Sequence, residues 1–307
     1  MSYDLYFYRK QNQQDKEGDI GNYLTENLCP SNEQASQWFY ENDDTEVYFS
    51  FDLNEPETDP EILESETIPD FDYTRFTFNL NFLRPDFFGR EAFLFVDQLI
   101  SDLNLYVVNP QAIIDKDLPI KPAAGDLYKD WSEINARQSA HFYKEFELNY
   151  YPLAASDAVW KHNFTRHQSQ ESLGEEYFIP KIIVLQTLTD KRIITMSVWP
   201  EHLPILVPQV DYFLIVKKYK KLFKEVEETG LISANNFQTQ FGKFINNSES
   251  GQIIIPTDAN SLEKLFNAIK FDGMLSGFAE KLPFEKMVNV MPQQNESEAE
   301  DSTLEIL

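Results

Sequence analysis

The stretch Phe76-Thr77-Phe78-Asn79-Leu80-Asn81-Phe82 alternates apolar and polar residues with a period of two. Successive side chains of a β-strand point to opposite faces, so this period predicts a half-buried strand. Its phenylalanines and Leu80 are expected to face a core, while Thr77, Asn79 and Asn81 face the other way. The fold of the first part of the chain is built outward from this strand.

A helix and a second strand are predicted directly after it. Apolar residues recur at spacings of three and four from Phe88 to Leu103, with Asp86 as the expected N-cap. Residues 105–108 then form a short apolar run that ends at Asn109-Pro110. Strand, helix and strand in this order predict a crossover that joins two parallel strands.

The remaining segments predict further strands and helices. Before the organising strand we expect a strand over 3–8, a short helix over 19–28, and a hairpin formed by 38–41 and 45–53. After it we expect helices over 127–146 and 156–175, a hairpin of 178–187 with 192–199, a strand over 211–216, and a charged helix over 217–228 capped by Gly230.

These elements predict an α+β fold with mostly antiparallel sheets, helices packed on them, and two domains. The expected division is an acidic α+β domain over 1–114, a linker over 115–126, a second α+β domain over 127–290, and an acidic flexible tail over 291–307. The linker is placed where Pro119, Pro122 and Gly125 coincide with a change in charge balance.

Composition excludes several classes of function. The chain has only 10 glycines in 307 residues and lacks the glycine-rich loops that hold dinucleotides or phosphates. Its four histidines lack metal-site spacing, so neither a metal nor a cofactor is expected. The single cysteine allows no internal disulfide, and neither a signal peptide nor a membrane-spanning run is found. We therefore expect a cytoplasmic protein that does not bind membranes.

The strongest signal is acidic charge in the first part of the chain. The net charge is −25, and residues 33–72 hold 14 Asp and Glu with no Lys or Arg. Such a surface disfavours nucleic acid and favours a basic protein partner, with solubility alone as the alternative explanation. The expected partner-binding residues are Asp43, Asp44, Glu46, Glu55, Glu57, Glu61, Glu64 and Glu66.

Two other segments carry alternative interpretations. The segment Trp199-Pro200-Glu201-His202 lies among prolines that stiffen the backbone. It is interpreted either as the edge of a pocket in an enzyme of unknown class, with Glu201 and His202 as acid and base, or as a crossover at a sheet edge. The basic cluster from Lys217 to Lys224 is interpreted as a solvated helix face. A structural or scaffold protein is the third alternative.

The opening Met1-Ser2-Tyr3-Asp4-Leu5 resembles the openings of uncharacterised bacterial immunity-like proteins associated with secreted toxins. The resemblance implies a bacterial protein that neutralises a toxin such as a nuclease. The resemblance assigns no catalytic or binding role to any residue of this chain. Together with the acidic surface, it leads to the expectation of an interaction protein, with an enzyme of unknown class and a structural protein as the alternatives.

Overall fold

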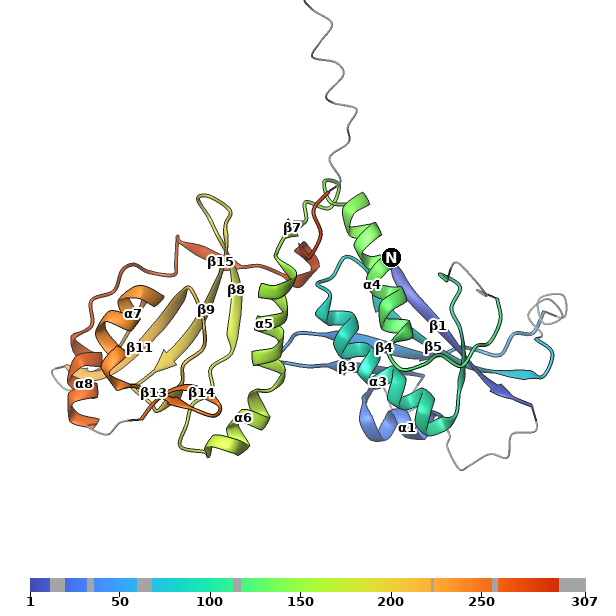
Figure 1. Ribbon diagram of the computed structural model, residues 1–307, viewed down its shortest axis with the longest axis horizontal. Coiled ribbons are helices and arrows are strands. Elements are labelled where there is room, and N and C mark those ends of the chain that lie inside the picture. The colour runs from blue at the N-terminus through green and yellow to red at the C-terminus, as the bar shows by residue number, and fades with distance from the viewer. Residues whose placement is uncertain are drawn as a thin grey trace, which may run out of the picture. The chain divides into compact units, whose positions relative to one another are not determined.

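The computed structural model describes residues 1–11, 20–31, 36–59, 68–112, 117–221, 224–255 and 259–292 (Figure 1). It has the predicted α+β architecture with mostly antiparallel sheets. The chain separates into two compact units: unit 1 contains Met1–Ser156 and the chain from Phe284 onward, and unit 2 contains Asp157–Pro283. Each unit is described by itself.

Unit 1 is built on a six-stranded sheet in the order β2-β3-β4-β5-β1-β6. The strands are β1 (Ser2–Lys10), β2 (Cys29–Pro30), β3 (Gln37–Glu41), β4 (Tyr48–Leu53), β5 (Phe71–Asn81) and β6 (Tyr106–Val108). All neighbouring strands are antiparallel. Because β5 and β6 both run opposite to β1, which lies between them, they are parallel to each other. The predicted crossover is therefore present, with β1 inserted into it.

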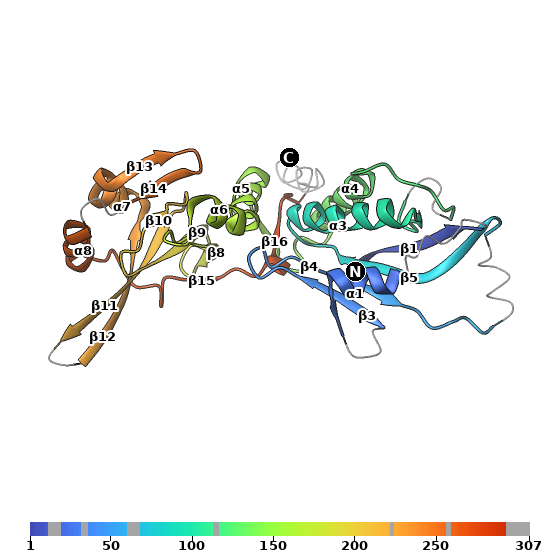
Figure 2. The same ribbon diagram turned by 90° about the horizontal axis from the view of Figure 1, so that it is seen from below.

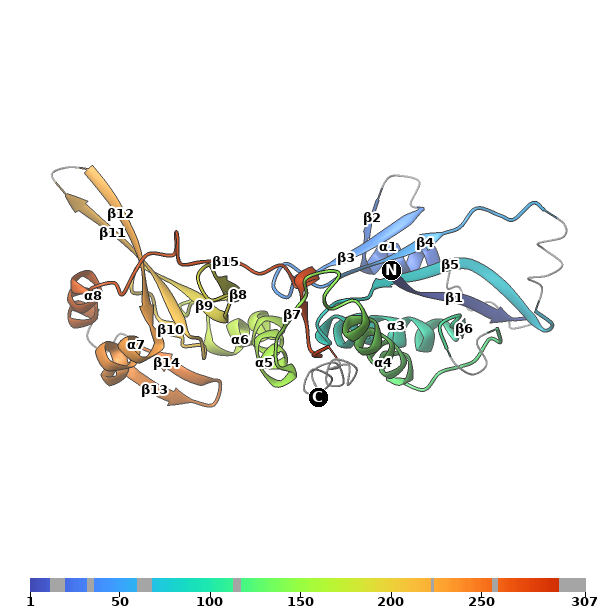
Figure 3. The same ribbon diagram turned by 90° about the horizontal axis from the view of Figure 1, so that it is seen from above.

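Three helices lie on one face of this sheet: α1 (Ile20–Asn27), α3 (Phe87–Leu103) and α4 (Asp126–His141). Figures 2 and 3 both show α3 and α4 together on one side of the strands. The helix α1 lies beside α3, since the Tyr23 and Phe95 rings are 6.2 Å apart, and its Thr25 accepts a hydrogen bond from the inward-facing Trp38.

The period-two prediction for β5 is confirmed. The residues Phe76, Phe78 and Leu80 are buried against the helices, whereas Asn79 and Asn81 are half-buried on the opposite face. Thr77 shares that opposite face but is also buried, because Asn54 donates a 2.7 Å hydrogen bond to its hydroxyl. The pattern thus fixes the face of each residue, while local contacts set its exposure.

The helix α4 belongs to unit 1, so the unit boundary differs from the predicted linker over 115–126. Asp86 directly precedes α3, but its carboxylate accepts hydrogen bonds from Tyr128 and Ser132 of α4, not from an amide of α3. The ring of Trp131 lies against Phe93, with their centroids 6.5 Å apart. These contacts hold α4 against α3. The helix α4 ends at His141, earlier than the predicted end at residue 146.

Unit 2 is an insertion into unit 1. The short strand β7 (Asn149–Tyr150) pairs in parallel with β16 (Met287–Val288), after the chain has passed through unit 2. Asn289 reinforces the return, because it accepts from the Asp86 amide at 2.6 Å and donates to the Tyr151 carbonyl at 2.8 Å. Residues 284–290 therefore belong to unit 1, not to the second domain as predicted.

Unit 2 contains a five-stranded sheet in the order β12-β11-β9-β8-β15 and a three-stranded sheet in the order β10-β14-β13. Its strands are β8 (Ile182–Thr187), β9 (Ile193–Pro200), β10 (Ile205–Leu206), β11 (Tyr212–Lys221), β12 (Lys224–Ser233), β13 (Ile245–Ser248), β14 (Gly251–Ile254) and β15 (Ala279–Lys281). Its helices are α6 (Arg166–Leu173), α7 (Ala234–Phe241), α8 (Ala259–Ala268) and most of α5 (Leu153–Phe164). Two 3-10 turns, Gly242–Phe244 and Phe284–Lys286, complete the described elements of the chain.

The helix predicted over 217–228 is wrong, because this segment forms the hairpin of β11 and β12. Its register places Lys217 opposite Glu228 and Lys218 opposite Glu227, so unlike charges face each other across the strands. Gly230 lies inside β12 and is not a helix cap. A Cβ atom added there would lie 2.1 Å from the Phe271 ring, so the contact with Phe271 requires glycine.

Candidate functional site

The turn between β3 and β4 is held on α3 by one buried carboxylate. Glu91 of α3 is 3% exposed, and its Oε1 accepts hydrogen bonds from the Tyr40 hydroxyl at 2.7 Å, Asn42 Nδ2 at 2.8 Å and the Thr45 hydroxyl at 3.0 Å. Burial, and then the charge of Glu91, raise the pKa of Tyr40, which therefore stays a donor. Asn42 also accepts from the Asp44 amide at 3.0 Å. This network gives the acidic turn a fixed conformation.

The predicted partner-binding residues fall into two separate groups. Asp43, Asp44 and Glu46 lie in the turn that precedes β4, whereas Glu55 and Glu57 are exposed beyond its other end. The six residues of β4 place these groups ~20 Å apart along the strand. Glu61, Glu64 and Glu66 lie outside the described residues.

Between the two groups lies the sheet face opposite the helices, here called the open face. The strand registers bring together Ser50 and Asp52 of β4, Asn79 of β5, and Asp4 and Tyr6 of β1. Each of these residues is half-buried, and α3 and α4 lie on the other side of the strands. Phe39 of β3, paired with Ser50, adds an aromatic ring that is 41% exposed.

Two carboxylates define the charge of the open face. Asp52 accepts a hydrogen bond from Asn79, the residue directly opposite Asp4 on the neighbouring strand. Desolvation raises the pKa of the Asp4 carboxyl, and the negative charge of Asp52 raises it further. The hydrogen bond that Asp4 accepts from the Ser2 hydroxyl lowers this pKa and so opposes the rise. Asp4 Oδ1 is shielded from water and accepts no hydrogen bond from the part of the chain that the structure describes.

Sequence reasoning missed the open face as a candidate site. Neither Asp4 nor Asp52 is among the partner-binding residues that the sequence predicts. A usable signal was present, since the same alternation that buries Phe49 and Phe51 turns Asp52 outward. What the sequence lacked was the order of the strands, which places β1 beside β5 and β5 beside β4.

The alternative pocket at 199–202 is not assembled by the structure. Trp199 is fully buried, with the rings of Phe237, Phe241 and Phe266 edge-on to it at 5.0–5.4 Å. Its indole N–H donates to the Leu203 carbonyl at 2.9 Å. This tryptophan is therefore part of the core of unit 2.

The two neighbouring residues lie in an exposed turn. Glu201 forms a 2.9 Å ion pair with Lys218, and His202 lies against the ring of Phe266 at 5.7 Å. Both have positive φ angles, 49° and 50°, which agrees with a tight turn after β9. The geometry gives them no shared cavity with Trp199.

Comparison of the chain with protein-family models, curated proteins and solved structures finds no match. Among the described residues, no three His, Cys, Asp or Glu side chains come together as a metal site. None of the described helices is both long enough and apolar enough to span a membrane.

Proposed function

We propose that this chain is an interaction protein whose unit 1 binds a basic protein partner through the open face and the acidic groups at its ends. The observation that carries the proposal is the placement of Asp4 and Asp52 on a helix-free face of a rigid sheet, with the acidic turn at one end and Glu55 and Glu57 at the other. The hairpin and its flanks, residues 36–59, contain no Lys or Arg that would neutralise this charge.

The chemistry of the face fits a protein better than a small molecule. It combines carboxylates with Tyr6, Tyr73 and the exposed ring of Phe39, and aromatic side chains are enriched where proteins bind each other. The carboxylates would steer a cationic partner and pair with its Lys and Arg. These side chains belong to hydrogen-bonded strands whose backbone is already ordered. Binding a partner therefore costs little backbone conformational entropy.

A basic toxin such as a nuclease is the most concrete partner of this kind. Nucleases bind phosphate with cationic surfaces, which an acidic face complements. The resemblance of residues 1–5 to bacterial immunity-like proteins is a second, independent reason for the same partner class. Both reasons support a cytoplasmic inhibitor in a bacterial cell.

A matched pair of variants tests the proposal. Asp52→Lys with Glu55→Lys reverses one charge on the open face and one in the acidic group at its end. The control, Glu133→Lys with Glu145→Lys, makes the same change at exposed positions of unit 1 on and after α4. The wild-type chain and both variants are used for affinity capture at low salt, and the association rate of any stoichiometric partner is then measured as salt is raised.

We expect a basic partner that binds the wild type and the control but associates much more slowly with the open-face variant. Its association with the wild type should slow as the Debye length falls from ~30 Å at 0.01 M salt to ~8 Å at 0.15 M. Unfolding measurements on each variant establish that the fold is intact. Equal association rates for the two variants would show that the open face is ordinary surface.

A further inference from the structure

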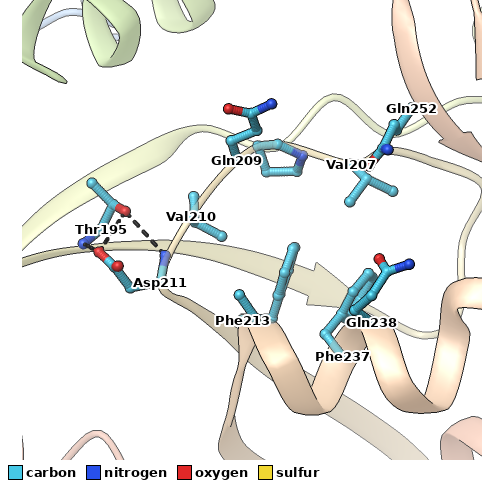
Figure 4. Close-up of a pocket in the computed structure, with 11 residues that line it drawn as sticks. Thr195, Val207, Gln209, Val210, Asp211, Phe213, Phe237, Gln238 and Gln252 are labelled. Atoms are coloured by element: carbon cyan, nitrogen blue, oxygen red, sulfur yellow. Dashed lines mark hydrogen bonds between the residues drawn. The ribbon is translucent and has the colours of Figure 1, made fainter. Parts of the chain in front are cut away.

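A surface pocket of about 370 Å³ lies in unit 2, between the segment that leads into β11 and helix α7 (Figure 4). Its apolar lining comes from Val207 and Val210 before β11, Phe213 of β11 and Phe237 of α7. The rings of Phe213 and Phe237 are stacked 4.0 Å apart and are buried, so this wall is rigid. The pocket is distinct from the open face of unit 1.

Three carboxamides surround this apolar lining. Gln209, Gln238 and Gln252 are exposed, and their side chains form no hydrogen bond with any described residue. The single charged lining residue, Asp211, is already engaged, because its Oδ2 accepts from the Thr195 amide at 2.7 Å and the Thr195 hydroxyl at 2.9 Å. The polar groups offered to a ligand are therefore mainly neutral donors and acceptors.

The backbone beside the pocket is also available. The Val207 amide donates to the Gln252 carbonyl at 2.7 Å, and the Asp211 amide donates to the Thr195 carbonyl at 3.1 Å. Between these two anchors, residues 208–210 lie outside any strand and make no backbone hydrogen bond within the described ranges. The amides of Gln209 and Val210 and the carbonyls of residues 208–210 are therefore unpaired within the described ranges, beside an apolar pocket with carboxamides around it.

We propose that this pocket binds an extended peptide segment of a partner, with one apolar side chain in the pocket. The flanking peptide groups would pair with the backbone of Gln209 and Val210 and with the three carboxamides, as in strand addition to an exposed backbone. The volume lies at the low end for ligand sites, which suits a side chain better than a nucleotide. Among the lining residues there is no Lys, Arg or His to hold a phosphate.

Nuclear magnetic resonance of the full-length chain tests this site with a minimal probe. N-acetyl-leucine N-methylamide carries one apolar side chain between two peptide groups, and N-acetyl-glycine N-methylamide is the same molecule without that side chain. We expect the leucine probe to shift the side-chain amide signals of Gln209, Gln238 and Gln252 in a saturable way. The glycine probe should bind more weakly, because it leaves the apolar lining exposed to water.

Three variants separate the site from nonspecific binding. Gln238→Ala with Gln252→Ala should weaken the leucine probe about tenfold, since each lost hydrogen bond costs a few-fold in affinity. Ala234→Leu places a larger side chain in the pocket lining and should abolish the saturable shifts. Gln98→Ala removes an exposed glutamine of unit 1 and should change nothing. Equal shifts with the glycine probe, or unchanged binding by Ala234→Leu, would overturn the proposal.

Discussion

Replacement of Glu91 by leucine is expected to release the acidic turn from α3. In the wild type, one buried carboxylate oxygen accepts three hydrogen bonds, from Tyr40, Asn42 and Thr45. Hydrogen bonds to charged groups contribute about 1.5–3 kcal/mol each, and part of this is offset by the cost of burying the carboxylate. Leucine leaves all three donors without their acceptor, so we expect a loss of about 3–5 kcal/mol.

Glutamine at the same position provides the comparison. It keeps an acceptor oxygen of similar size but lacks the charge, so Glu91→Gln should cost only about 1–2 kcal/mol. Glu133→Leu, an exposed substitution on α4, should stay within about 0.5 kcal/mol of the wild type. The order of the three variants follows from burial and charge, not from the size of the side chain.

Hydrogen exchange measures this loss where it occurs. The amide of Asn42 donates to the Val47 carbonyl at 3.0 Å and that of Glu46 to the Asn42 carbonyl at 2.6 Å, so both report opening of the turn. Each 1.4 kcal/mol lost should speed their exchange about tenfold, up to the unprotected rate. A Glu91→Leu variant with wild-type exchange at both amides would refute the role assigned to the carboxylate.

Three further predictions concern unit 2. Lys217→Met should destabilise the protein by about 2 kcal/mol, because the buried ammonium of Lys217 donates to the Ile269 carbonyl at 2.8 Å. Lys218→Met should cost less than about 0.5 kcal/mol, because the ion pair of Lys218 with Glu201 is exposed. Urea unfolding measures both, and equal effects would contradict the strand assignment. Burial lowers the pKa of His162 below its usual 6.5, so the unfolded state takes up a proton first and stability should fall as pH drops below 6.5. His162→Gln should lose part of this pH dependence in thermal unfolding, and an unchanged pH profile would argue against it. Trp199→Ala should cost about 3–5 kcal/mol, the loss expected for a buried tryptophan, and a small loss in denaturant unfolding would restore the pocket interpretation.

Local patterns in the sequence determine much of unit 1. The alternation from Phe76 to Phe82 determines the face of each residue, because side chains on a strand alternate regardless of what the strand pairs with. The apolar spacing from Phe88 to Leu103 likewise determines a helix with one buried face. Both signals depend only on residues near in sequence, and both predictions are confirmed.

The segment from Lys217 to Glu228 shows where local pattern fails. Lys and Glu are good helix formers, so their density predicts a helix. In the folded chain, the pairing of β11 with β12, which places Lys217 opposite Glu228, outweighs that propensity. The burial of Lys217 depends equally on a distant partner, the carbonyl of Ile269.

Only the tertiary structure decides the unit boundary and the candidate site. The boundary depends on the pairing of β7 with β16, in which the Asn149 side chain donates to the Lys286 carbonyl across 137 positions of sequence. The open face depends on β1 lying beside β5, which places Asp4 next to Asn79 and close to Asp52. A single sequence does not show that residues so far apart in the chain are neighbours in the fold. The order of strands in a sheet depends on which apolar faces are buried together, not on local propensity.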